Sequence, residues 1–388
     1  MNNNANQIKT TGIIAIMLIS SLTVMVGTAI TPALPELGRI YQLGNYASWL
    51  VTAPALGVVV TTVLFGRLID KVGPYKIAFI GLLCYGCFGI AGAYMPNVIT
   101  IFIDRLLLGA ATAAVMNASV AFISSFFQGE QQLKILSIQS MSMEFGGVIF
   151  LTVSGILADI SWRCPFYIYG LGFIAFIGLI LFIPRANARH DPAILEQTEN
   201  DADKKGVPLG LVLVIAFLGM LMFFTAVVAL PLYLQNQLGY SPSFTGYYLA
   251  ALDLVAVVAA GFVPRAVKKI AAKGCLTLAF LFYAAGFSQY FFCGDSPLLW
   301  VAAICIGIGF GFSTPLFNNL IVNKSTAANK GLHISFGTMA MFTGQFLSAL
   351  LISVLPAQRL FLIAALIALV IMVLILPVVK HYHQRRSC

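Results

Sequence analysis

Apolar runs of about twenty residues, separated by short polar breaks, make up nearly the whole sequence. An α-helix needs about twenty residues to cross ~30 Å of hydrocarbon at 1.5 Å per residue. Stretches such as 12–29 and 360–379 are apolar on every face, whereas the strands of a transmembrane barrel alternate apolar and polar residues. The pattern therefore predicts an all-α integral membrane protein with twelve transmembrane helices. The predicted spans are 11–31, 46–66, 77–95, 98–125, 135–158, 164–183, 208–234, 243–264, 275–293, 298–322, 332–355 and 359–379.

Composition agrees with this pattern. Hydrophobic residues make up 60% of the chain and charged residues 9%, against about 25% charged residues in a soluble domain. The first apolar run is longer than the hydrophobic region of a signal peptide and lacks a small-residue cleavage pattern, so we interpret it as an uncleaved first span. Cys84 and Cys87 form a C-x-x-C pair inside an apolar helix, where buried, inert thiols are the simplest interpretation.

Basic residues predict the orientation. Eighteen of the 22 Lys and Arg residues fall on the side of the predicted bundle that holds both termini. The positive-inside rule then places both termini in the cytoplasm of a multi-pass protein of the cell (inner) membrane. The net charge of +9 is explained by the basic residues on this side of the predicted bundle. They do not form a patch concentrated enough to bind nucleic acid.

The longest polar interruption is 184–207, which is rich in charge and has no apolar face. We interpret it as a cytoplasmic linker between an N-terminal six-helix bundle, 1–183, and a C-terminal six-helix bundle, 208–388. Two such halves indicate repeats related by pseudo-two-fold symmetry, an arrangement typical of transporters whose halves rock around a midplane site.

The loop between the second and third predicted spans carries the most specific motif. It reads GRLIDKVGPYK over 66–76 and resembles the loop signature of the major facilitator superfamily. Two glycines permit a tight turn, and an acid among cations can contact donors at a helix terminus. The resemblance implies a gating loop that uses Gly66, Asp70, Lys71 and Gly73. The alternative is a charged stop between two spans.

Other segments resemble parts of the same family less completely. The run 28–35 is similar to the first-helix pattern of drug and metabolite exporters, but Val26 stands where that pattern has an acid. Ser154 and Gly155 resemble the end of the antiporter signature, although Phe150 and Leu151 stand where it expects Gly-Pro. In the loop between the eighth and ninth spans, Arg265 stands where Asp70 would be expected, so that loop is a decayed copy.

Charged residues inside the predicted spans are the candidates for proton coupling. Arg105 lies eight residues beyond Asn97, roughly 12 Å below the membrane surface, where a guanidinium needs a partner or a wet cavity. The resemblance associates this arginine with proton coupling. The alternative is a structural ion pair with Asp104 or Glu144, of which Glu144 is expected to be the better partner because adjacent helix residues point to different faces.

Glu144 lies at a depth similar to that of Arg105 and is the first choice for a titrating group. Burial opposes its ionisation and Arg105 favours it. A permanently ionised partner of Arg105 is the alternative. Asp253 is a third mid-membrane charge, interpreted as a proton or cation binder or as a protonated acid bonded to a carbonyl.

The substrate cavity is predicted to involve polar and aromatic residues of the inner spans. The candidates are Asn117, Asn318, Asn319, Phe223 and Phe310. Asn318 and Asn319 lie in the tenth span, which lines the cavity in the family. Packing or lipid-facing roles are the alternative for the phenylalanines.

Together these features predict a secondary active transporter of the drug and metabolite antiporter type. It would export a small amphipathic molecule, such as a drug or a secreted metal chelator, against protons, and so contribute to multidrug resistance. An uptake symporter or uniporter is the alternative, and a non-transporting receptor is the third hypothesis. No enzyme motif is present, so we expect no catalytic activity, no cofactor and no bound metal, and a monomer whose partners are the solute, protons and the lipid bilayer.

Overall fold

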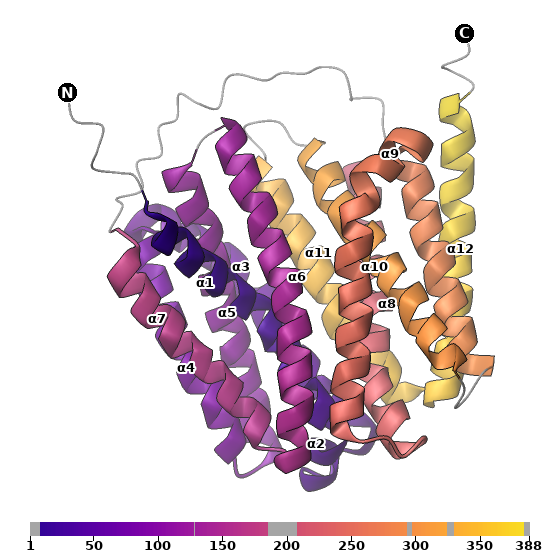
Figure 1. Cartoon of the computed structure of the whole chain (residues 1–388), viewed down its shortest axis with the longest axis horizontal. Helices are drawn as coiled ribbons and strands as arrows, with labels where there is room; N and C mark the ends of the chain where they lie inside the picture. Colours follow the sequence, from indigo (N-terminus) through magenta and orange to yellow (C-terminus); the bar gives the residue numbers. More distant parts are fainter. Residues whose placement is uncertain (1–7, 128, 185–207, 293–296, 324–329, 384–388) are drawn as a thin grey trace. The chain divides into compact units, whose positions relative to one another are not determined.

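The computed structural model describes residues 8–127, 129–184, 208–292, 297–323 and 330–383, and the regular structure within them is entirely helical. The helices are α1 (Thr10–Thr28), η1 (Thr31–Ala33), α2 (Leu34–Ile40), η2 (Gly44–Ser48), α3 (Trp49–Val72), α4 (Pro74–Ala91), η3 (Gly92–Tyr94), α5 (Val98–Phe126), α6 (Gly129–Ile160), η4 (Cys164–Gly170), α7 (Leu171–Phe182), α8 (Leu209–Asn236), α9 (Pro242–Phe292), α10 (Leu298–Asn323), α11 (Lys330–Val354) and α12 (Ala357–His383). Figure 1 shows these helices.

Eleven helical segments of the described part are long and apolar enough to cross a membrane. One of them, α9, has 51 residues, or about 77 Å at 1.5 Å per residue, more than twice the thickness of the hydrocarbon core. Its backbone leaves helical geometry at Ala271, with φ 59° and ψ 165°, and its two arms, 242–270 and 272–292, fold back beside each other (Figure 1). The predicted twelve spans are confirmed, with the eighth and ninth joined by this bend.

The chain divides into two compact units. The first comprises Met1–Ile194 with Ser241–Gly246, and the second comprises Leu195–Tyr240 with Tyr247–Cys388. The predicted linker lies outside the described residues apart from Pro184, so the proposed domain boundaries stay a prediction.

Small residues allow the helices of each unit to approach closely. In the first unit, a Cβ placed on Gly109 of α5 would lie 2.0 Å from the carbonyl oxygen of Pro54 in α3. In the second unit, a Cβ on Gly344 of α11 would lie 2.3 Å from the carbonyl oxygen of Phe217 in α8. Because lipid tails are as apolar as leucine, such close packing is a main source of helix association in a bilayer.

The predicted gating loop is shorter than its sequence pattern suggested. Gly66 is a helical residue of α3, and only Gly73 separates α3 from α4. Gly73 has φ 86° and ψ 154° and donates its N–H to the carbonyl oxygen of Ile69 at 2.9 Å. The expectation that both glycines make the turn was therefore wrong, because the residues between them include the good helix formers Arg67, Leu68 and Lys71 and no proline, and α3 extends to Val72.

We expect Gly73→Ala to destabilise the protein by about 1–3 kcal/mol, because its backbone conformation is essentially restricted to glycine. The melting temperature in detergent micelles measures the effect. Gly66→Ala is the matched control, since an added Cβ there meets no atom within 4 Å and alanine favours the helix. Equal melting temperatures for the two variants would contradict the turn assignment.

Candidate functional site

Arg105 and Asp104 form a buried ion pair inside the first unit. Both lie on α5, which starts as predicted after Asn97: the N–H of Thr100 donates to Asn97 Oδ1 at 2.9 Å. Arg105 is 0% exposed and Asp104 is 3% exposed. A charge pair so far from water needs good geometry to offset its desolvation.

The guanidinium holds a single carboxylate oxygen of its neighbour. Arg105 Nε donates to Asp104 Oδ2 at 3.0 Å, and Nη2 donates to the same oxygen at 2.6 Å. The expectation that Glu144 would be the better partner was wrong. Adjacent helix residues do start toward different faces, but the arginine side chain is long enough for its Nε and Nη2 to reach Asp104 Oδ2.

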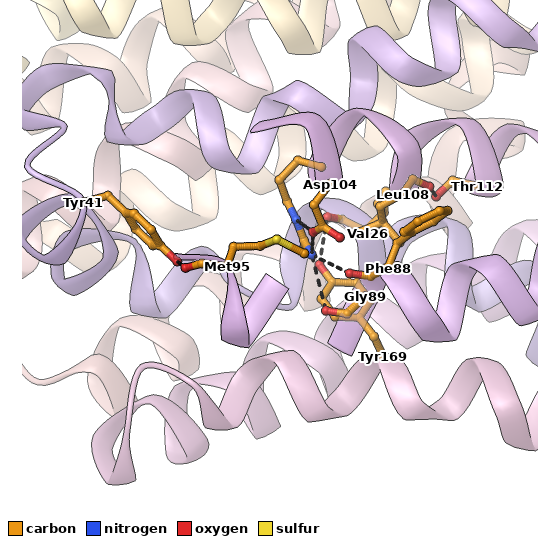
Figure 2. A network of polar contacts seen from close by, with 10 residues as sticks. Val26, Tyr41, Phe88, Gly89, Met95, Asp104, Leu108, Thr112 and Tyr169 are labelled. Atoms are coloured by element: carbon orange, nitrogen blue, oxygen red, sulfur yellow. Dashed lines mark hydrogen bonds and ion pairs between the residues drawn. The ribbon is translucent and has the colours of Figure 1, made fainter. Parts of the chain in front are cut away.

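Arg105 also binds the C-terminal end of α4. Its Nη2 donates to the carbonyl oxygens of Phe88 and Gly89 at 3.0 and 3.3 Å (Figure 2). These are two of the last four carbonyls of α4, the helix end where carbonyls run short of intrahelical partners; the Phe88 oxygen also accepts the backbone N–H of Gly92. A cation at this position also interacts favourably with the helix dipole, so Arg105 caps α4 from the neighbouring helix.

Aromatic rings enclose the guanidinium from the side of η4. Its carbon lies 5.1 Å from the ring centroid of Phe166 and 5.4 Å from that of Tyr169. Glycines of the preceding span make room for this packing. A Cβ on Gly92 would lie 2.3 Å from Arg105 Nη2, and one on Gly89 would lie 2.2 Å from Tyr169 Cβ.

Tyrosine hydroxyls tie the cluster to α1. Tyr85 donates to the carbonyl oxygen of Leu22 at 2.6 Å, and Tyr169 donates to that of Val26 at 3.2 Å. Val26, which stands where the exporter pattern has an acid, therefore contributes its backbone carbonyl to this cluster (Figure 2).

A third tyrosine marks the end of the cluster. Tyr41, just beyond the first span, donates to the carbonyl oxygen of Met95 at 2.8 Å, and burial raises the pKa of its hydroxyl. The Tyr41 hydroxyl therefore stays a neutral donor at physiological pH.

Two polar atoms of the pair have no partner among the described residues: Arg105 Nη1 and Asp104 Oδ1. The remaining polar atoms join α4 and α5, and the rings add η4. This arrangement fixes three elements of one unit around a neutral pair. It is the geometry of a structural clamp, which was the alternative interpretation of Arg105.

Glu144 has a different environment on α6. It is half-buried, and within the described part of the chain it makes no hydrogen bond or ion pair. Ser137 and Ser140, which share its side of the helix by their spacing, are exposed. A separate stripe holds exposed apolar residues, including Met141 and Phe145. Since polar groups are costly in hydrocarbon, the apolar stripe is better suited to face lipid than the stripe that holds Glu144.

A third side of α6 contains a polar cluster that the sequence analysis missed. The amide of Gln139 donates to Ser20 Oγ of α1 at 2.8 Å and to Ser119 Oγ of α5 at 3.0 Å. Each serine hydroxyl donates in turn to a carbonyl of its own helix, that of Ile16 or Met116. A glutamine inside a predicted span, opposite serines of two other spans, was the available signal.

Three predicted cavity residues of the inner spans are engaged in helix packing. Asn117 Nδ2 donates to the carbonyl oxygen and to Oγ1 of Thr62, at 3.0 and 3.2 Å, and so links α5 to α3. Phe223 of α8 and Phe310 of α10 stack on each other with ring centroids 3.5 Å apart. The alternative, packing, describes what these phenylalanines do in the second unit.

The remaining candidates also lie in the second unit. Asn318 and Asn319 are exposed on α10, and Asp253 is buried on the first arm of α9. The structure thus joins Asp104 to Arg105 and Phe223 to Phe310, and it places Glu144 on α6 without a contact to Arg105.

Comparison of the sequence with known proteins identifies a family and several relatives of this chain. The sequence profile described as Major Facilitator Superfamily matches residues 16–347. The quinolone resistance protein NorA of Staphylococcus aureus (strain COL) is 24% identical over 338 residues, covering 84% of this chain and 86% of that protein. The riboflavin transporter RibZ of Clostridioides difficile (strain 630) is 23% identical, covering 76% and 77%.

A third relative matches over a shorter region, and solved structures match the fold. The puromycin resistance protein pur8 of Streptomyces alboniger is 28% identical over 178 residues, which are 45% of this chain and 35% of that protein. A structure of the nucleoside transporter NupG has a TM-score of 0.76 at 12% identity, covering 95% of this chain and 99% of that one. The xylose transporter XylE from E. coli has a TM-score of 0.74 at 13% identity, covering 94% of each chain.

We expect Arg105→Gln to destabilise the protein by about 3–5 kcal/mol, because it leaves the Asp104 carboxylate buried without its counterion. Asp104→Asn should cost less, since Arg105 keeps the carbonyls of α4 and the two rings. The double variant should be more stable than Arg105→Gln alone, because replacing Asp104 as well removes the buried carboxylate that would otherwise lack its counterion. Melting temperatures of the three variants measure this coupling.

Arg163→Gln is the control for this cycle. Arg163 is exposed and lies over the ring of Trp162, so its replacement should change stability by less than about 0.5 kcal/mol. Strictly additive losses for Arg105 and Asp104 would contradict the clamp.

Proposed function

The chain belongs to the major facilitator superfamily of secondary transporters, and from this premise we propose that it exports a small amphipathic molecule in exchange for protons. The family does not consist of enzymes, so solute movement has to draw on an ion gradient or on the gradient of the solute itself. In alternating access, a proton that binds one state more tightly than the other biases which side is open.

The proposal rests on the surroundings of Glu144. A carrier of protons has to be reachable from water in at least one state and free to change its charge. Glu144 meets both requirements, since it is half-buried, stands in line with two exposed serines, and has no ion pair within the described residues. Protonation makes its side chain neutral, which lowers the cost of enclosing it when access from water closes.

Arg105 and Asp104 act on this site indirectly in our proposal. Their pair is enclosed by α4 carbonyls and η4 rings, so in our proposal the pair stabilises the helices against which α6 moves during transport.

Asp253 is proposed as a second proton-binding acid, in the other unit. The turn at Gly73, with Gly66, Asp70 and Lys71 before it, is proposed as the gate latch. Direct tests of these roles are charge-neutralising variants assayed for coupling.

The substrate class rests on the relatives. Two of them are named for resistance to drugs, quinolones and puromycin, and both drugs are small molecules with apolar and polar parts. These names support export of a compound of that kind and favour it over uptake. The solute is proposed to lie against Asn117, Asn318, Asn319, Phe223 and Phe310 once packing between these residues opens.

Uptake by symport or uniport is the second candidate. Val26 replaces the acid of the exporter pattern on the first helix, and the Gly-Pro of the antiporter signature is absent before Ser154. A riboflavin transporter is among the relatives. Solute flux in inside-out and right-side-out vesicles distinguishes the two directions: export requires accumulation in inside-out vesicles when their interior is acidic.

We expect Glu144→Gln to reduce gradient-driven flux of a fluorescent quinolone or ethidium by about tenfold, the scale of a coupling free energy of about 1.4 kcal/mol. Exchange of the same dye without a proton gradient should persist, because the variant removes the titrating group and keeps the side chain's size. Reconstituted liposomes with a pH-sensitive dye inside measure both solute and proton movement.

Glu36→Gln is the matched control, because it makes the same chemical change at another half-buried acid of the first unit, on α2. Undiminished proton coupling in Glu144→Gln would reject Glu144 as the carrier. Absence of flux for a broad panel of dyes and antibiotics in both vesicle orientations would reject the exporter and favour a non-transporting receptor.

A further inference from the structure

The bend of α9 concentrates positive charge at one end of two spans. Arg265, Lys268 and Lys269 precede Ala271, and Lys273 follows it. No acidic residue occurs between Asp253 and Asp295 in the sequence. We call the segment 262–273 the α9 elbow. The three cations before the bend are exposed, and the one after it is half-buried.

The elbow also exposes apolar side chains beside these cations. Phe262 is 51% exposed and Ile270 is 46% exposed. The guanidinium carbon of Arg265 lies 6.0 Å from the ring centroid of Phe262, so the cation and an exposed ring form one surface. Cations next to exposed aromatic and aliphatic groups are typical of segments at a membrane–water interface.

The position of the elbow in the fold is also consistent with a place at the membrane–water interface. Its arms have 29 and 21 residues by their bounds, or about 43 and 31 Å of helix at 1.5 Å per residue, each enough to cross the hydrocarbon. The bend between two crossing arms therefore has to lie at the membrane surface (Figure 1).

The elbow carries two unfavourable features that an anion would offset. Its four cations lie close together along the chain and repel one another. In addition, Ala271 has φ 59° and ψ 165°, a region that is strained for a residue with a Cβ. An anion that binds cations on both arms reduces the repulsion and holds the arms together across the strained residue.

We propose that the α9 elbow binds the phosphate headgroup of an anionic phospholipid. Lys268 and Lys269 from one arm and Lys273 from the other contact the phosphate, while Phe262 and Ile270 rest on the adjoining acyl region. Clusters of four or more Lys and Arg residues next to a span are typical binding sites for anionic lipids, because each cation near the surface adds attraction to the headgroups. This surface is separate from the transport residues proposed above.

The acidic segment 191–203 of this chain is the competing occupant. It contains five acids and lies outside the described residues: Asp191, Glu196, Glu199, Asp201 and Asp203. The exposed apolar groups of the elbow favour lipid, because an acidic polar segment would leave Phe262 and Ile270 uncovered.

The test is the thermal stability of the full chain reconstituted in vesicles of POPC or of POPC with POPG at about 3:1, the second of which supplies anionic headgroups. We expect POPG to raise the melting temperature of the wild-type protein by a few degrees, because a ligand that binds only the folded state stabilises it. The double variant K268Q/K269Q should lose at least half of this shift. In pure POPC, the variant and the wild type should melt at nearly the same temperature.

The matched control is R39Q/R163Q, which removes two exposed cations from the first unit and changes the net charge equally. It should keep the full POPG shift. An equal shift in K268Q/K269Q and in the wild type would overturn the proposal.

If the acidic segment 191–203 occupies the elbow instead of lipid, the test gives a different result. In that case K268Q/K269Q would lower the melting temperature in pure POPC, and this loss would vanish in a background carrying E196Q/E199Q/D201N/D203N. That result would assign the elbow to the acidic segment and would also overturn lipid binding.

Discussion

An ion in hydrocarbon is costly unless its counterion and further polar groups compensate its charge, and this constraint organises the first unit. Arg105 Nε and Nη2 bind Asp104 and two carbonyls at the end of α4, and two aromatic rings cover the guanidinium, while Arg105 Nη1 and Asp104 Oδ1 have no partner among the described residues. This packing requires glycines at the C-terminal end of the third span, because a Cβ at Gly89 would overlap the side chain of Tyr169 and a Cβ at Gly92 would overlap the guanidinium. One buried charge therefore determines how three elements pack.

The same constraint separates structural charges from functional ones. The Arg105–Asp104 pair is fully enclosed and pairs within one helix, so a change of protonation there would break contacts on every side. Glu144 is half-buried and unpaired within the described residues, so its charge can change at lower cost. Both residues are mid-span charges in the sequence, and only their surroundings distinguish a clamp from a candidate proton carrier.

Much of the fold could be predicted because hydropathy and helix signals are local. The spans followed from the length of apolar runs, and Asn97 marked the start of α5. The partner of Arg105 could not be predicted, because it depends on where a long side chain places its guanidinium among the neighbouring helices. Likewise Gly66 and Gly73 look equivalent in the motif, and only the backbone shows that one is helical and the other makes the turn.

The adjacency of Asp104 and Arg105 has a consequence for how the protein is made. Phe166 and Tyr169, which cover the guanidinium, are synthesised about sixty residues after it. The carboxylate, by contrast, leaves the ribosome directly before the arginine. The fourth span can thus enter the bilayer as a neutral segment and wait there for the sixth, whereas an arginine whose counterion lay on a later span would have to cross the insertion machinery uncompensated.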